Sequence, residues 1–204
     1  MNVTEVVTRV QRQFGDEASI QITEADVIRW INDAQADIAL HSGLLQTRST
    51  TPVIKGLSTY ALPPDILTLH SVRFNGVQLK GVSMQEADSS IDNMESTGTP
   101  TMFWSYGKNI SLWPVPNSAL VLLLFYSRRP VPIVTNATPL ELPVQYHNRV
   151  VEYCLQQAYE LDENWAAAGQ KQQQFSEGLT RLKADEEFPI REFYPSITSI
   201  PEHF

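Results

Sequence analysis

The centre of the chain reads Leu-Thr-Leu-His-Ser-Val-Arg-Phe-Asn-Gly-Val-Gln-Leu-Lys over residues 67–80. Apolar and polar side chains alternate on both sides of Asn75-Gly76, and this is the period of a β-strand. Both central residues of a type I′ turn need a positive φ angle, which Asn-Gly adopts with little strain. The stretch therefore predicts a β-hairpin, and the helical patterns before and after it predict a mixed α+β chain.

Two helices are predicted before this hairpin. The first covers Val3–Phe14, where apolar residues recur every three or four positions and Gly15 follows at a C-cap position. The second begins after Thr23, because the sequence Thr-Glu-Ala-Asp resembles a capping box with Asp in place of Glu. Its apolar stripe lasts to Ile38. We expect the two helices to be antiparallel and joined by a turn at Ser19–Ile22.

At about Thr47 the period of apolar residues changes from 3.6 to two, which indicates β-strands. Short strands are predicted at Thr51–Ile54, Ser58–Leu62, Thr101–Tyr106 and Asn109–Trp113. The last two form a second hairpin that turns at Gly107-Lys108. Leu120–Ser127 is apolar at nearly every position, so we expect a central strand that is covered on both faces. The polar segment Met84–Asn93 is expected to hold a short helix.

Helical periodicity returns after Pro143, a residue suited to the first position of a helix. The apolar face of this helix is wide and includes Cys154. A last helix is predicted over Trp165–Ala184, and Gly169 and Gly178 weaken it.

Residues 185–204 contain aromatic side chains without any period, so they cannot form a core of their own. We expect an extended segment that becomes ordered on a partner. The side chains predicted to dock are Phe188, Ile190, Phe193, Tyr194, Ile200 and Phe204.

These elements predict an α+β fold: a helical bundle of about four helices, a β-sandwich-like insertion between helices two and three, and an extended C-terminal tail. The predicted domains are residues 1–46 (the N-terminal helical pair), 47–142 (the inserted β domain), 143–184 (the C-terminal helical pair that completes the bundle) and 185–204 (the docking tail).

The composition is acidic, with a formal net charge of −8 and a pI of about 5.0. Phosphate neutralisation requires Lys and Arg, so free nucleic acid is disfavoured as a partner of the whole surface. The single cysteine allows no intramolecular disulfide, which fits synthesis in a reducing cytoplasm. The first residues do not predict a signal peptide. The longest apolar run, Ala119–Tyr126, is far shorter than the ~20 residues that span a bilayer, so no membrane segment is expected.

No arrangement of residues predicts catalysis, a cofactor or a metal. Cys154 lies within an apolar helical face, where a thiol behaves as a small hydrophobe rather than as a nucleophile. The histidines include no pair at metal-ligand spacing, and they are His41, His70, His147 and His203. His70 is expected at a sheet surface or edge. Phosphate-binding, dinucleotide-binding and nucleophile-elbow motifs are missing from the sequence.

Two classes of function stay open on the residues alone. A virion-carried cell-wall hydrolase would need a carboxylate or histidine site in a cleft. A carbohydrate-binding module could use Trp104, Tyr106 and Trp113 on neighbouring predicted strands, although such aromatics more often form a core or an interface. An exposed flat row of these rings would support this use, and burial would count against it. The pair Arg128-Arg129 could contact a phosphate, and a salt bridge is the simpler interpretation.

Several short segments are individually weak signals but become more specific through their order and spacing. They are Trp30-Ile-Asn-Asp-Ala-Gln-Ala-Asp-Ile38, Tyr60-Ala-Leu-Pro-Pro-Asp65, Leu69-His-Ser-Val-Arg-Phe-Asn-Gly76, Gly98-Thr-Pro-Thr-Met-Phe103, Ile110-Ser-Leu-Trp-Pro-Val-Pro116, Phe125-Tyr-Ser-Arg-Arg-Pro130 and Leu142-Pro-Val-Gln-Tyr-His147. Through them nearly the whole chain resembles the head–tail adaptor (connector) proteins of tailed bacteriophages, of the tail-tube adaptor type.

The resemblance implies a structural virion protein and carries over no catalytic residue. It implies an adaptor subunit that connects the portal to the tail and forms part of the DNA conduit. The implied partners are the portal protein, tail (nozzle or tube) proteins and further copies in a ring, commonly about twelve. DNA would pass through without sequence-specific binding. The implied location is the head–tail interface of the virion, after assembly in the host cytoplasm.

Overall fold

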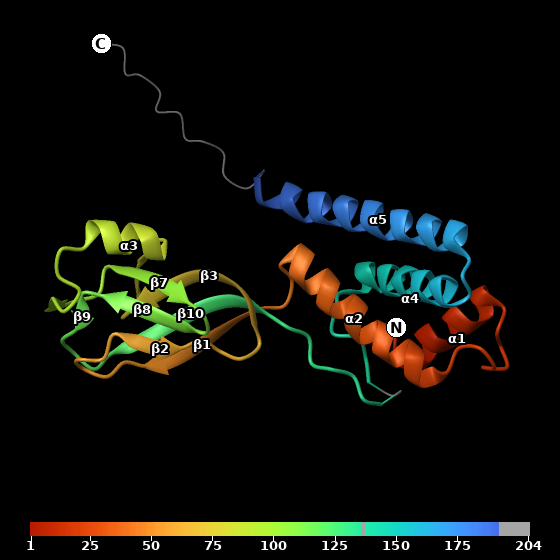
Figure 1. The fold of residues 1–204 in the computed structure, drawn as a ribbon, viewed down its shortest axis with the longest axis horizontal. Helices are drawn as coiled ribbons and strands as arrows, with labels where there is room; N and C mark the ends of the chain where they lie inside the picture. The colour runs from red at the N-terminus through yellow and green to blue at the C-terminus, as the bar shows by residue number, and fades with distance from the viewer. Residues whose placement is uncertain (136–137, 192–204) are drawn as a thin grey trace, which may run out of the picture. The chain divides into compact units, whose positions relative to one another are not determined.

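The computed structural model describes the backbone of residues 1–135 and 138–191, with side chains up to residue 184 (Figure 1). The chain divides into two compact units. One consists of Met1–Ile38 together with the chain from Val131 onward, and we call it the helical unit. The other consists of Ala39–Pro130, and we call it the β unit.

Helix α1 covers Val3–Phe14, as the sequence predicts. The side chain of Asn2 accepts a hydrogen bond from the backbone N–H of Glu5, and the Glu5 carboxylate accepts one from the N–H of Asn2. This capping box satisfies two N–H groups that a helix start leaves unpaired. Gly15 ends the helix in the left-handed region, at a φ angle of 92°.

The turn between the first two helices is organised by Asp16. Its carboxylate accepts hydrogen bonds from three backbone N–H groups, those of Ile20, Gln21 and Ile22. These bonds, that from Ile22 above all, hold the pKa of Asp16 below its ordinary value. Helix α2 then covers Glu24–Ser42. The predicted cap is present, because the side chains of Thr23 and Asp26 each accept a hydrogen bond from the other residue's backbone N–H.

The C-terminal helices are the short 3-10 helix η1 (Val144–Tyr146), α4 (His147–Leu161) and α5 (Trp165–Arg191). The most extensive packing between helices joins α4 to α5 and α1 to α4. Helix α4 supplies most of the buried face, with Val150, Val151, Cys154, Leu155 and Ala158. Helix α5 continues past the predicted end at Ala184, so the backbone of residues 185–191 is helical rather than extended.

The β unit contains three sheets, one complete helix and the last turn of α2. The first sheet has the order β1-β10-β3-β4, made by Gln46–Pro52, Val121–Arg128, Ile66–Phe74 and Val77–Gln78. The second has the order β2-β8-β7-β5, made by Thr59–Ala61, Asn109–Trp113, Met102–Tyr106 and Lys80–Gly81. The third pairs β6 (Thr97–Gly98) with β9 (Val115–Pro116), and helix α3 covers Met84–Ser90.

Both predicted hairpins are confirmed. Asn75 and Gly76 have φ angles of 48° and 82°, the two positive values that a type I′ turn requires. The strands β3 and β4 pair antiparallel on either side of this turn. The strands β7 and β8 pair antiparallel around Gly107-Lys108.

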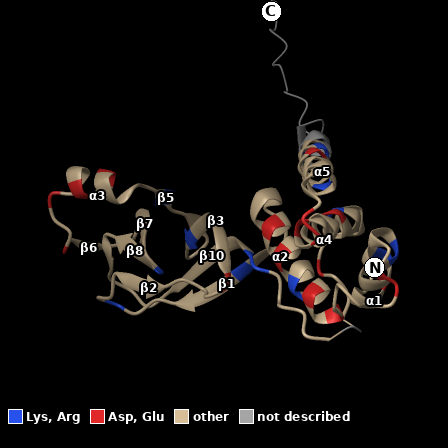
Figure 2. Cartoon of the chain, turned by 45° about the vertical axis from the view of Figure 1, so that its right-hand side comes forward, with Lys and Arg blue, Asp and Glu red and all other residues tan. Residues whose placement is uncertain are grey.

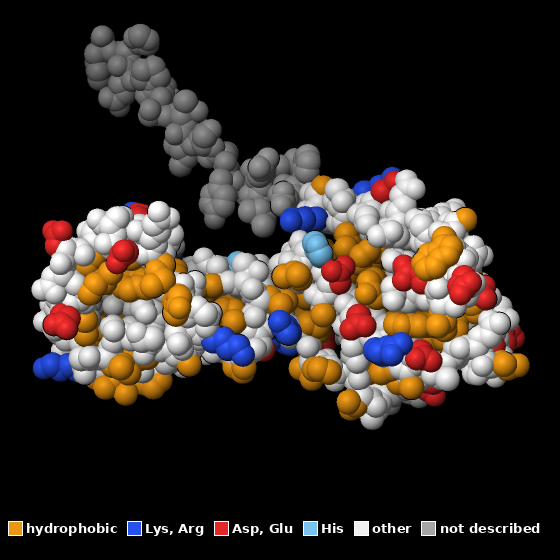
Figure 3. Space-filling model, in the orientation of Figure 1, with side chains coloured by type: hydrophobic (Ala, Val, Ile, Leu, Met, Phe, Trp, Pro, Cys, Tyr) orange, Lys and Arg blue, Asp and Glu red, His pale blue; other side chains and the backbone are white. Residues whose placement is uncertain are grey.

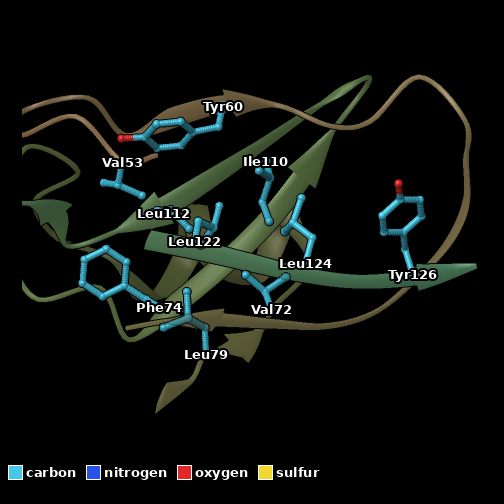
Figure 4. Close-up of a cluster of buried hydrophobic side chains, with 10 residues drawn as sticks. All are labelled: Val53, Tyr60, Val72, Phe74, Leu79, Ile110, Leu112, Leu122, Leu124 and Tyr126. Carbon is cyan, nitrogen blue, oxygen red and sulfur yellow. The ribbon is translucent and has the colours of Figure 1, made fainter. Parts of the chain in front are cut away.

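The core of the β unit lies between the first and second sheets (Figure 4). Its members are Val53, Tyr60, Val72, Phe74, Leu79, Ile110, Leu112, Leu122, Leu124 and Tyr126. Strand β10 is central, as predicted, but the expected coverage of both its faces is wrong. Leu122 and Leu124 are fully buried, whereas Val121 is 47% exposed and the alternating positions Leu123 and Phe125 are only half-buried. The second sheet therefore covers one face of the first, and the other face reaches the surface.

The α+β class is confirmed, but a bundle of about four helices with a single β-sandwich-like insertion is wrong. The predicted extended tail is helical up to Arg191, and its residues 192–204 lie outside the described part of the chain. Residues 1–135 and 138–191 contain five α-helices, of which α3 belongs to the β unit, and their strands divide over three sheets. The division was not predictable because strands such as β5 and β6 are two residues long and pair in parallel, so they leave no periodic signal.

Candidate functional site

The segment Trp30–Ile38 contributes two amide side chains that hold the irregular segment after β10. The Asn32 amide donates to the carbonyl oxygen of Ile133 at 3.0 Å and accepts from its N–H at 2.8 Å. The fully buried Gln35 accepts a hydrogen bond from the N–H of Glu141 at 3.1 Å. A segment without regular structure needs such partners for its backbone groups. Sequence reasoning missed both residues, although two amides three positions apart on an apolar helix were a usable signal.

The segment Tyr60–Asp65 has a similar structural task in the β unit. The hydroxyl of the buried Tyr60 donates to the carbonyl oxygen of Leu57 at 2.7 Å and accepts from the N–H of Ile54 at 3.1 Å. Burial raises the pKa of Tyr60. The carboxylate of Asp65 accepts a hydrogen bond from the hydroxyl of Tyr126 at 3.2 Å. Tyr60 and Asp65 therefore attach loops to the core of the β unit. Their hydrogen bonds serve the fold and give no indication of catalysis.

His147 is buried at the start of α4, and both nitrogens of its ring have a hydrogen-bond partner. Its Nε2 lies 2.8 Å from the carbonyl oxygen of Leu142, and its Nδ1 lies 2.8 Å from the amino group of Met1. A carbonyl oxygen only accepts, so Nε2 carries the proton and Nδ1 accepts from the amine. Burial lowers the pKa of His147. A neutral imidazole that joins the amino group of Met1 to an internal backbone carbonyl group has a structural role.

His70 and Ser127 lie close together, with 2.7 Å between His70 Nε2 and Ser127 Oγ. This distance is typical of a catalytic serine–histidine pair, in which the histidine accepts the proton of the serine hydroxyl. Here the hydrogen bond has the opposite direction. The Ser127 hydroxyl donates to the carbonyl oxygen of Gly43 at 2.8 Å, so His70 Nε2 must donate to Ser127 Oγ and cannot act as its base. Ser127 is also completely buried, and no substrate can approach its oxygen from outside.

Cys154 is completely buried, and burial raises the pKa of its thiol, which therefore stays protonated near neutral pH. Its interpretation as a core cysteine is confirmed. In the part of the chain that the structure describes, no three His, Cys, Asp or Glu side chains are grouped to hold a metal ion. None of the helices within the described ranges is long and apolar enough to cross a membrane.

The aromatic residues Trp104, Tyr106 and Trp113 share the face of the second sheet that points away from the core. Tyr106 is 66% exposed, whereas both tryptophans are half-buried. The indole N–H of Trp113 donates to the carbonyl oxygen of Asn93 at 3.0 Å. The three rings therefore do not form the uniformly exposed row that sugar binding would favour.

Arg128 and Arg129 brace the chain where it leaves the β unit. The N–H of Arg129 donates to the carbonyl oxygen of Asp65 at 2.8 Å, and the Arg128 guanidinium donates to the carbonyl oxygen of Arg129 at 3.0 Å. The predicted docking residues fall outside what the structure describes. Residues 192–204 are not described at all, and this holds also for the side chains of Phe188 and Ile190.

Charge is distributed unevenly between the two units (Figure 2). The helical unit carries eight Lys and Arg against eighteen Asp and Glu, whereas the β unit carries seven against five. The described strands contain no Asp or Glu, and their charged residues are Arg48, Arg73, Lys80 and Arg128. A chain of net charge −8 thus presents a weakly basic unit and a strongly acidic one.

The sequence is similar to that of one known protein family over nearly its whole length. A search of curated proteins finds no match. The model of one protein family, described as SU10 adaptor protein, matches residues 1–192. This match includes both units and confirms the resemblance to phage head–tail adaptor proteins. The chain therefore belongs to the SU10 adaptor protein family, a family of structural adaptor proteins of bacteriophages.

Proposed function

We propose that the protein is a subunit of a homo-oligomeric adaptor ring that joins the portal of a tailed phage to its tail. The observation that carries this proposal is the family match over residues 1–192. A structural role is also supported by the side chains of Asn32, Tyr60 and His147, because each of them forms hydrogen bonds with backbone groups of the chain itself. The partners would be the portal protein and tail (nozzle or tube) proteins, at the head–tail interface of the virion.

The ring would contain about twelve copies, and the two units would give each copy two chemically different surfaces. Head-to-tail contacts between different surfaces can close into a ring. DNA would pass through this ring without sequence-specific binding. The excess of Asp and Glu in the helical unit supports passage rather than attachment, because an acidic wall repels phosphates.

The residues after α5 would dock on a neighbouring copy or on the portal. Deletion of residues 192–204 should abolish incorporation into particles and leave the far-ultraviolet circular dichroism of the purified protein unchanged. Replacement of Phe193, Tyr194, Ile200 and Phe204 by alanine should have the same effect at full chain length. The matched control is Ser196→Ala with Thr198→Ala, which should be incorporated normally. Normal incorporation of the deletion variant would refute the docking role.

A further inference from the structure

The first sheet presents an open face with an apolar ridge along β10. Val121, Leu123 and Phe125 alternate with the core residues, so they point away from the second sheet. Val121 is 47% exposed, and the other two side chains are half-buried. Figure 3 shows that apolar side chains reach the surface of both units. An apolar strip on a sheet face is a typical site of protein association.

Two exposed arginines flank this ridge. Arg48 on β1 lies opposite Phe125, and Arg73 on β3 lies opposite Leu123. The Arg73 guanidinium is 5.9 Å from the centre of the Phe125 ring. Neither arginine has a carboxylate partner among the described residues, so both charges are available to a partner. We call this surface the basic sheet face.

The turn between α4 and α5 has the opposite charge. Trp165 is 68% exposed and Leu161 is 60% exposed. Between them lie Asp162 and Glu163, both exposed and without a cationic partner in the described part of the chain. Tryptophan is enriched among the side chains that contribute most to binding at protein interfaces. We call this surface the acidic corner.

We propose that the basic sheet face of one copy binds the acidic corner of a second copy. Each surface combines apolar side chains that reach the solvent with two charges that have no ion-pair partner among the described residues, and the two pairs of charges have opposite sign. The interaction joins two different surfaces, so each copy can bind one neighbour through each of them. The proposal rests on the proposed function, because it assigns the contact between copies in the ring.

A charge exchange tests the contact. The double variant Arg48→Glu with Arg73→Glu makes the sheet face acidic, and Asp162→Lys with Glu163→Lys makes the corner basic. Each variant alone places like charges against each other and should associate with itself roughly tenfold more weakly than the wild type. Sedimentation equilibrium of the full chain, alone and on the cognate portal, measures this change.

The two variants mixed in equal amounts should recover association. The acidic sheet face of the first then meets the basic corner of the second, and the unmodified surfaces also remain complementary. The matched control is Lys55→Glu with Lys108→Glu, which changes the charge of the β unit equally but lies outside the sheet face. It should associate like the wild type. Trp165→Ala should weaken association about tenfold or more, and Val144→Ala, which removes another exposed apolar side chain of the helical unit, should not.

The proposal is overturned if the mixture does not recover, or if the wild type does not self-associate either alone or on the portal. Binding of DNA that is lost in the Arg48→Glu, Arg73→Glu variant, without any change in self-association, would assign the sheet face to phosphate instead. The proposed function is judged separately by portal binding. A chain that self-associates through these surfaces but ignores the portal would refute the adaptor role and keep the contact.

Discussion

The guanidinium of Arg149 crosses helix α5 at Gly178 and fills the space that a Cβ atom on residue 178 would occupy. Arg149 is 20% exposed, pairs with the Glu152 carboxylate at 2.7 Å and donates to the carbonyl oxygen of Gln174 at 2.8 Å. The glycine that weakens the isolated helix is thus what allows α4 and α5 to approach at this point.

Gly178→Ala should therefore destabilise the protein, although alanine is the better helix former. The guanidinium would have to move, which would disturb its ion pair with the largely buried Glu152 and its hydrogen bond to Gln174. We expect a loss of about 1–3 kcal/mol in the free energy of unfolding, typical of overpacking. The matched control is Gly169→Ala in the same helix, where no atom lies near the added methyl group. It should gain about 0.5–1 kcal/mol. Equal gains in both variants, measured by urea unfolding, would contradict this role of Gly178.

Asn32→Ala should cost about 1–3 kcal/mol, because both backbone groups of Ile133 lose their partner in a half-buried place. Asn148→Ala is the control, since its exposed amide hydrogen-bonds only with Arg9 among the described residues, and it should change stability by less than about 0.5 kcal/mol. Thermal unfolding measures both. Similar small effects would show that the irregular segment does not depend on the amide of α2.

The pH dependence of stability should contain a contribution from His147. Burial lowers its pKa below the ordinary 6.5, so the unfolded chain binds a proton that the folded chain resists. The contribution of His147 to the free energy of unfolding is then fully present above pH 6.5, and it is lost as the pH falls toward the lower pKa of the folded state. The amino group of Met1 and the carboxylate of Glu5 also act on this imidazole, in opposite directions. His147→Gln should be less stable at neutral pH and should lose stability less steeply below it. An unchanged slope of melting temperature against pH would contradict the assignment.

Cys154 should not react with a thiol reagent in the folded protein, because it is completely buried and its pKa is raised. Denaturant should expose it, so the reaction should appear with the unfolding transition. Rapid reaction under native conditions would show that α4 is not packed as described.

Local signals in the sequence predicted the local structure well. Asn75-Gly76 required a turn with two positive φ angles, and Val3–Phe14 had both the period and the C-cap glycine of a helix. The core position of Cys154 followed from the apolar face of α4. In each case the residues that decide the structure are neighbours in the chain.

Features that join distant residues were not predictable in the same way. From the sequence, Gly178 was interpreted only as a residue that weakens a helix, because no neighbouring residue indicates that Arg149 packs against it. The open face of β10 was missed because an apolar strand looks the same whether one or two layers cover it. The acidic corner and the basic sheet face are surfaces, and their exposure is known only once the fold is known.

The adaptor role itself is tested most directly by the mass of the full chain mixed with its cognate portal, measured by native mass spectrometry. We expect one large complex that contains the portal and about one adaptor chain per portal subunit. A species of 23.0 kDa that stays free in the presence of the portal would contradict the adaptor role.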